Sequence, residues 1–160
     1  MREIPQGELA PPWQAFLRDL DAALSGPVEL DCLGGFVVAL AYGAGRATSD
    51  IDVLSVRAAG TDNVEKLGGL GSVLHRRHLR LMVLDPIDLA LTKVERNAEV
   101  DRRDVIALAR AGWLDAAAFR VRYADEVAPY LLAHQARHDD TAESFARLIE
   151  ASASDATARR

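Results

Sequence analysis

Two adjacent glycines between a strand pattern and a helix pattern constrain the fold of this chain more than any other feature. Gly34 and Gly35 follow the alternating segment 28–33, which is typical of a strand. They precede the apolar segment 36–41, which is typical of a buried helix. Glycines at such a turn let a ligand approach the backbone closely, and the following helix directs free N–H groups at an anion. We therefore predict an anion site at this turn, although the glycines could instead serve only tight packing of the strand on the helix.

A pair of carboxylates follows the second glycine after fourteen residues, on a predicted strand over 50–56. Side chains alternate along a strand, so Asp50 and Asp52 should project to one face about 7 Å apart, with Ile51 and Val53 toward the core. Magnesium takes oxygen ligands, commonly from one or two protein carboxylates and from substrate phosphates. We predict that Asp50 and Asp52 bind Mg²⁺, with Mn²⁺ as the alternative ion. The structural alternative is an exposed strand face or a cap for the following turn.

These two motifs, in this order, resemble the signature of the polymerase beta-type nucleotidyltransferase superfamily. The chain is most similar to the small bacterial members related to AbiEii-type toxins. The resemblance covers about residues 28–112 and includes the segments 88–96 and 101–106, which look like the Lys-containing and acidic helices of that group. It implies an α/β (α+β) fold, with the small mixed sheet of the nucleotidyltransferase fold followed by a helical C-terminal half.

The resemblance also implies a reaction and its residues. The expected activity is Mg²⁺-dependent transfer of a nucleoside monophosphate from a nucleoside triphosphate to an acceptor hydroxyl on RNA such as tRNA, on a protein or on a small molecule. The implied catalytic residues are Asp50, Asp52, Lys93 and Asp104, and the implied nucleotide-binding residues are Gly34, Gly35, Arg46, Thr48 and Lys93. Arg46 and Thr48 just precede the acids, where a guanidinium and a hydroxyl could reach phosphate oxygens. A role in a toxin-antitoxin or phage-defence pair, with a cognate antitoxin as partner, is implied in the same way.

Alternatives stay open for the function and for the residues of the later helices. The strand expected at 79–84 carries no acid, although polymerase beta-type enzymes place a third carboxylate in a later strand. Asp85 at the end of this strand and Asp104 on a helix are the candidate substitutes. The alternative function is therefore a non-catalytic nucleotide-binding or protein-interaction module with a degenerate site. Lys93 and Arg96 are three residues apart and should share one helical face, from which they could pair with phosphates. The alternative for this region is solvent-exposed ion pairing among Glu95, Arg96, Glu99, Arg102 and Arg103.

Length and charge limit the remaining possibilities. A chain of 160 residues fits a single domain over 1–160, with a core motif region at 28–112, a helical part at 113–150 and a frayed tail at 151–160. The net charge, 19 minus 24 or −5, argues against a surface built wholly for nucleic acid. The local cluster at 75–80 could contact phosphates, or could be a solvated strand end and turn. No apolar segment is long enough for a membrane span, and the lone Cys32 fits a core strand, so we predict a cytoplasmic protein.

Helical periodicity and breaker residues predict the other elements. A first helix is expected over 12–25, a second over 35–42 and a short one over 61–67, which the glycines at 68–71 should end in a turn. Further helices are expected over 87–97, over 102–111 before Gly112, and from an Asp115 cap toward 127. The last helix should include Phe145, Leu148 and Ile149.

Overall fold

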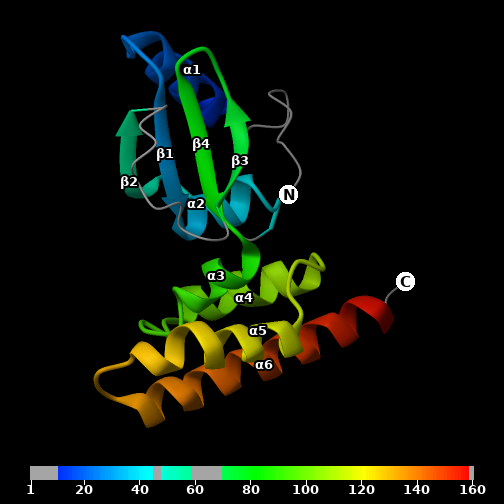
Figure 1. The fold of residues 1–160 in the computed structure, drawn as a ribbon. Coiled ribbons are helices and arrows are strands. Elements are labelled where there is room, and N and C mark those ends of the chain that lie inside the picture. Colours follow the sequence, from blue (N-terminus) through cyan, green and yellow to red (C-terminus); the bar gives the residue numbers. More distant parts are fainter. Residues whose placement is uncertain (1–10, 45–47, 59–69, 159–160) are drawn as a thin grey trace. The chain divides into compact units, whose positions relative to one another are not determined.

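The computed structural model describes residues 11–44, 48–58 and 70–158 (Figure 1). The chain forms two compact units, Met1–Ala41 with Ala47–Asp85, and Tyr42–Arg46 with Pro86–Arg160. The expectation of one domain over 1–160 stays a prediction. The predicted α/β class is confirmed, because a mixed sheet with helices is followed by a mainly helical half.

The first unit is built on a four-stranded sheet with the order β2-β1-β4-β3. Strand β1 pairs antiparallel with β2 and parallel with β4, and β3 pairs antiparallel with β4. Figure 1 shows helices α1 and α2 on the same face of this sheet. The elements are α1 (Pro11–Ala23), β1 (Val28–Leu33), α2 (Gly34–Leu40), β2 (Asp52–Ala58), β3 (Leu70–His75) and β4 (Leu79–Leu84).

The apolar core of this unit lies between the two central strands and the two helices. Leu79, Leu81 and Val83 alternate along β4 and are fully buried. The ring of Phe36 on α2 meets that of Trp13 on α1 edge-on, with the centroids 4.9 Å apart. The alternating pattern of β4 therefore selects the face that receives both helices, as the period of a strand requires.

Cys32 lies in this core, as the sequence predicts. Burial, and then the neighbouring charge of Asp31, raise the pKa of the Cys32 thiol to about 12. The thiol therefore stays protonated at neutral pH and behaves as a small apolar side chain.

The second and third strands differ from the prediction. Strand β2 begins at Asp52, two residues later than expected, and Val53 is 40% exposed, so its predicted core position is wrong. Two causes are visible: β2 pairs only with β1 among the described strands, and a bulge at Asp31/Cys32 interrupts the alternation. Strand β3 is not among the predicted strands, because the glycines at 68–71 predict a turn where this strand begins. The predicted helix at 61–67 lies outside the described residues.

The second unit is helical. Its core includes Phe119, Phe145 and Ile149, of which the last two confirm the predicted inner face of the final helix. Helix α6 continues to Ala158, so residues 151–158 are helical where the sequence suggested a frayed tail. The elements are α3 (Pro86–Leu91), α4 (Glu99–Arg110), α5 (Ala116–Arg122), a π-type segment η1 (Tyr123–Val127), a 3-10 turn η2 (Ala128–Tyr130) and α6 (Gln135–Ala158). No helix in the described part of the chain is both long enough and apolar enough for a membrane crossing.

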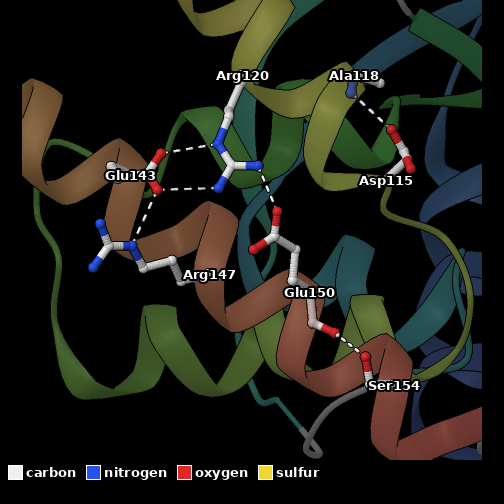
Figure 2. A network of polar contacts seen from close by, with 7 residues as sticks. All are labelled: Asp115, Ala118, Arg120, Glu143, Arg147, Glu150 and Ser154. Carbon is white, nitrogen blue, oxygen red and sulfur yellow. Dashed lines mark hydrogen bonds and ion pairs between the residues drawn. The ribbon is translucent and has the colours of Figure 1, made fainter.

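The ends of these helices follow local sequence signals. Gly112 adopts a φ of +80° just after α4, a conformation that favours glycine and closes the helix as predicted. Asp115 caps α5, because its Oδ1 accepts a hydrogen bond of 2.7 Å from the Ala118 N–H (Figure 2).

Arg120 on α5 links two glutamates of α6, as Figure 2 shows. Its Nε lies 2.8 Å from Oε2 of Glu143, and its Nη1 lies 2.6 Å from Oε1 of Glu150. Arg147 donates to Glu143 as well, at 3.1 Å. Hydrogen bonds from Arg120 and then from Arg147 lower the pKa of the Glu143 carboxyl to about 2.

Acid should weaken this link between α5 and α6. Because the folded-state pKa of Glu143 lies below its ordinary value, the stabilisation is present above that ordinary value and is lost as the pH falls toward about 2. We expect the urea midpoint of the wild type to exceed that of Glu143→Gln near neutral pH, and the difference to shrink at about pH 3. Equal differences at both pH values would contradict this assignment.

Candidate functional site

The turn between β1 and α2 brings Gly34 and Asp52 into direct contact. Gly34 has a φ of +74°, and Asp52 faces Leu33 across the β1–β2 ladder. A Cβ built on Gly34 would lie 1.8 Å from Oδ2 of Asp52, far inside contact distance. Two constraints therefore favour glycine at this position. The backbone adopts a conformation that side chains disfavour, and the Asp52 carboxylate occupies the space that a side chain would fill.

The start of α2 adds a polar surface to this turn. No described side chain caps the helix, since its N-cap is Leu33, and Phe36 and Val37 anchor its buried side. The first N–H groups of a helix have no partner within the helix, and they carry a partial positive charge. Beside the exposed Asp52 carboxylate, the turn thus offers both an oxygen ligand and N–H donors.

Asp50 lies before β2 rather than on it, so the prediction that both acids share one strand face is wrong. Its Oδ1 accepts a hydrogen bond of 2.7 Å from the Ser49 hydroxyl. The Thr48 hydroxyl lies 3.4 Å from the Asp50 carbonyl oxygen and 3.5 Å from its N–H. Thr48 and Asp50 therefore form a local turn at the entry to β2. The predicted contribution of Arg46 lies outside the described residues.

The predicted residues Lys93 and Asp104 belong to the second unit, where they form a buried ion pair. Lys93 lies in the turn after α3, and its side chain is 5% exposed. Its Nζ donates to Oδ2 of Asp104 at 2.8 Å and lies 3.7 Å from Oδ1 of Asp101. Lys93 therefore does not share an exposed helical face with Arg96, and that part of the prediction is wrong. Its predicted role in a catalytic cleft stays a prediction.

Asp101 connects this pair to the surface. Its Oδ2 accepts from the Ala98 N–H at 2.9 Å at the start of α4, and Arg96 donates to both of its oxygens. Burial raises the pKa of Asp101, but the Arg96 hydrogen bonds, the Ala98 N–H and the Lys93 charge outweigh it and leave the pKa below its ordinary value. The two carboxylates thus neutralise Lys93 inside the unit, while an exposed arginine covers Asp101 from outside.

Asp31 is a buried carboxylate that is not among the predicted site residues. It lies on β1 with 2% exposure. Arg57 donates to both of its oxygens, at 3.0 and 2.5 Å, and the Ser55 hydroxyl donates to it as well. Hydrogen bonding to Asp31 raises the pKa of Arg57. These bonds tie β2 to β1 two residues before Leu33, the residue of β1 that faces Asp52.

A signal for this network was present in the sequence. Glu29 and Asp31 alternate with apolar residues on β1, and Arg57 follows at the matching spacing on β2. Glu29 receives a hydrogen bond of 2.7 Å from Arg80 of β4 and lies 3.5 Å from Arg57. Oppositely charged side chains on one sheet face are typical of cross-strand pairing.

Among the described residues, no group of three or more His, Cys, Asp or Glu side chains is arranged to hold a metal ion. Comparison with protein-family models, with curated proteins and with solved structures finds no match to this chain. The resemblance to polymerase beta-type nucleotidyltransferases therefore stays a prediction that rests on the residues described above.

Proposed function

We propose that the chain is a nucleotidyltransferase whose first unit binds a nucleoside triphosphate with Mg²⁺ at the β1–α2 turn. The observation that carries this proposal is the Asp52 carboxylate, which occupies the space that a side chain on Gly34 would fill. An acid held this close to the open end of a helix can share a metal-bound triphosphate with the backbone N–H groups.

The donor set fits a hard cation. Asp50 and Asp52 are exposed and offer carboxylate oxygens, which Mg²⁺ prefers. When bound, the ion would neutralise charge that develops on the phosphate oxygens. In the transfer, the acceptor hydroxyl releases its proton to water and its oxygen bonds to the α-phosphorus, the bond from this phosphorus to the bridging oxygen breaks, and pyrophosphate leaves. The residues of the chain contribute by position: Gly34 keeps the backbone open, and Thr48 holds the turn that presents Asp50.

The second unit contributes differently in this proposal. Asp104 already neutralises Lys93 in a buried pair, so direct contact of Lys93 with phosphate would require the pair to open. This arrangement supports a role of the pair in folding. The resemblance alone supports three further parts of the proposal, namely the acceptor, an antitoxin partner and a cytoplasmic location.

Label transfer tests the assignment of Asp52. With labelled nucleoside triphosphates, Mg²⁺ and a total RNA and protein extract, we expect the wild type to label an acceptor. We expect Asp52→Asn to lower the rate by about 100-fold or more, because a neutral amide cannot balance the charge of the bound ion. Asp19→Asn is the matched control, since Asp19 is exposed on α1 and, among the described residues, forms an ion pair only with the adjacent Arg18. Transfer that persists after both Asp50→Asn and Asp52→Asn would remove these residues from the reaction.

The second candidate is a nucleotide-binding or interaction module without catalysis, and the sequence of β4, which has no acid, favours it. Calorimetry with Mg²⁺ and each triphosphate separates the two functions. Binding without turnover would support the module, turnover would support the enzyme, and the absence of binding would contradict the nucleotide site in both.

A further inference from the structure

Strand β2 carries Asp52 but adds little to the apolar core. It lies at the edge of the described sheet, where it pairs only with β1 (Figure 1). None of its seven residues is buried, and its three large apolar side chains, Val53, Leu54 and Val56, are exposed. Burial of apolar surface therefore contributes little to the placement of this strand, and other contacts must hold it.

The ladder between β1 and β2 is interrupted near the start of β2. Asp31 faces Ser55, but the next residue, Cys32, faces Val53, so Leu54 has no partner on β1. A bulge of this kind leaves one residue unpaired and disrupts the ladder locally. Backbone pairing alone therefore holds the start of β2 less firmly than a regular ladder would.

Charged side chains join β2 to the two central strands. Arg57 donates to both oxygens of Asp31, and the Ser55 hydroxyl donates to the same carboxylate. Arg57 also lies 3.5 Å from Glu29, which accepts a hydrogen bond of 2.7 Å from Arg80 on β4. The side chains of Asp31 and Arg57 are 3% and 15% exposed, so solvent screens their charges weakly. These bonds attach β2 through side chains where its apolar residues do not.

The buried pair between Asp31 and Arg57 favours one register of β2. Paired hydrogen bonds between a guanidinium and a carboxylate specify direction as well as distance. A slip of β2 by one residue would turn Arg57 to the opposite face and leave Asp31 buried without a countercharge. Apolar residues often replace a buried ion pair without loss of stability, and the best-attested role of such a pair is to specify register.

We propose that Asp31 and Arg57 are positioning residues for Asp52. This inference rests on the proposed function, because Asp52 is the carboxylate assigned there to the metal-bound triphosphate. In the register that the pair favours, the Asp52 carboxylate reaches the turn at Gly34. Without the pair, β2 is free to shift along β1, and Asp52 loses its fixed place at this turn.

The double variant Asp31→Leu with Arg57→Met separates position from stability. Both members of the buried pair become apolar, so the urea midpoint should stay close to that of the wild type. Glu29 keeps its hydrogen bond from Arg80. The rate of label transfer at saturating triphosphate should fall on the order of tenfold or more, because displacement of a positioned group by about 1 Å can cost about 100-fold.

Arg18→Met with Asp19→Leu is the matched control for this double variant. It removes one cation and one anion from an exposed pair on α1, so the rate of label transfer and the urea midpoint should stay unchanged. If Asp31→Leu with Arg57→Met matched this control in both measurements, the proposal would be wrong.

Gly34→Ala reports the place of Asp52 without any reaction. The new Cβ meets the Asp52 carboxylate only while that carboxylate keeps its place. Gly34→Ala should therefore lower the urea midpoint less in the Asp31→Leu with Arg57→Met background than in the wild type or in the control. An equal decrease in all three backgrounds would show that the pair does not position Asp52.

Arg57→Lys keeps the test decisive if the double variant folds poorly. A lysine keeps a cation beside Asp31 but lacks the fixed fork of donors that reaches both carboxylate oxygens. Its circular dichroism should match that of the wild type, and its rate of label transfer should fall severalfold. A wild-type rate, together with a wild-type response to Gly34→Ala, would overturn the proposal.

The proposal and the proposed function fail in different ways. A wild type that transfers no label would reject the nucleotidyltransferase, whereas the response of stability to Gly34→Ala would still test the pair. Transfer that is lost in Asp52→Asn but unaffected in Asp31→Leu with Arg57→Met would keep the function and reject the positioning role.

Discussion

Lys93→Met is expected to lower the free energy of unfolding by about 3–5 kcal/mol, as measured by urea denaturation. Among the described residues, Lys93 is the only hydrogen-bond donor to the Asp104 side chain, so the substitution leaves that carboxylate buried without a countercharge. Asp101 is affected less, because it keeps Arg96 and the Ala98 N–H. We expect Asp104→Leu to cost less than Lys93→Met, because Lys93 retains Asp101 at 3.7 Å.

The double variant Lys93→Met with Asp104→Leu separates a structural role from a catalytic one. Replacing both members of a buried ion pair with apolar residues is often neutral, so much of the lost stability should return. Arg103→Met is the control for removal of a cation, since Arg103 forms an exposed pair with Glu99 and its replacement should cost less than about 1 kcal/mol. If Lys93→Met left stability unchanged but stopped label transfer, Lys93 would belong to the catalytic cleft instead.

Local signals in the sequence determine much of the first unit. The bounds of β1 and β4 agree with the predicted segments 28–33 and 79–84, because alternation and flanking breakers define a strand without reference to its partners. The need for glycine at position 34 could be predicted for the same reason, since the turn between strand and helix is local. The caps at Gly112 and Asp115 belong to the same class of signal.

Features that depend on pairing could not be predicted from one sequence. The register of β1 against β2 skips Leu54, so the alternation of β2 is interrupted next to the exposed Val53, and nothing in the local pattern marks this bulge. The burial of Lys93 depends on carboxylates eight and eleven residues away on α4, which periodicity alone assigns to a solvated helix. The alternation of Glu29 and Asp31 on β1 indicates a charged sheet face, but the partner that neutralises Asp31 lies on a different strand and follows only from the pairing. Charged residues inside a fold are thus where sequence patterns are least informative.

Gly34→Ala should impair both stability and transfer. A side chain at φ +74° costs about 1–2 kcal/mol, and the new Cβ would also lie 2.7 Å from Cγ of Asp52. The Asp52 carboxylate must then rotate away from the turn. Displacement of a positioned group by about 1 Å can reduce a rate by about 100-fold, so we expect label transfer to fall by at least that factor.

Gly112→Ala provides the matched control, because Gly112 has a similar φ of +80° and a Cβ there would meet no described atom within 4 Å. Its effect on stability measures the backbone cost alone, and Gly34→Ala should exceed it by the cost of the clash with Asp52. In Gly34→Ala with Asp52→Ala, the clash is absent, so the destabilisation attributable to Gly34→Ala should return to that of the control. A Gly34→Ala protein that matched Gly112→Ala in stability and kept full transfer would show that the contact between glycine and carboxylate has no part in the site.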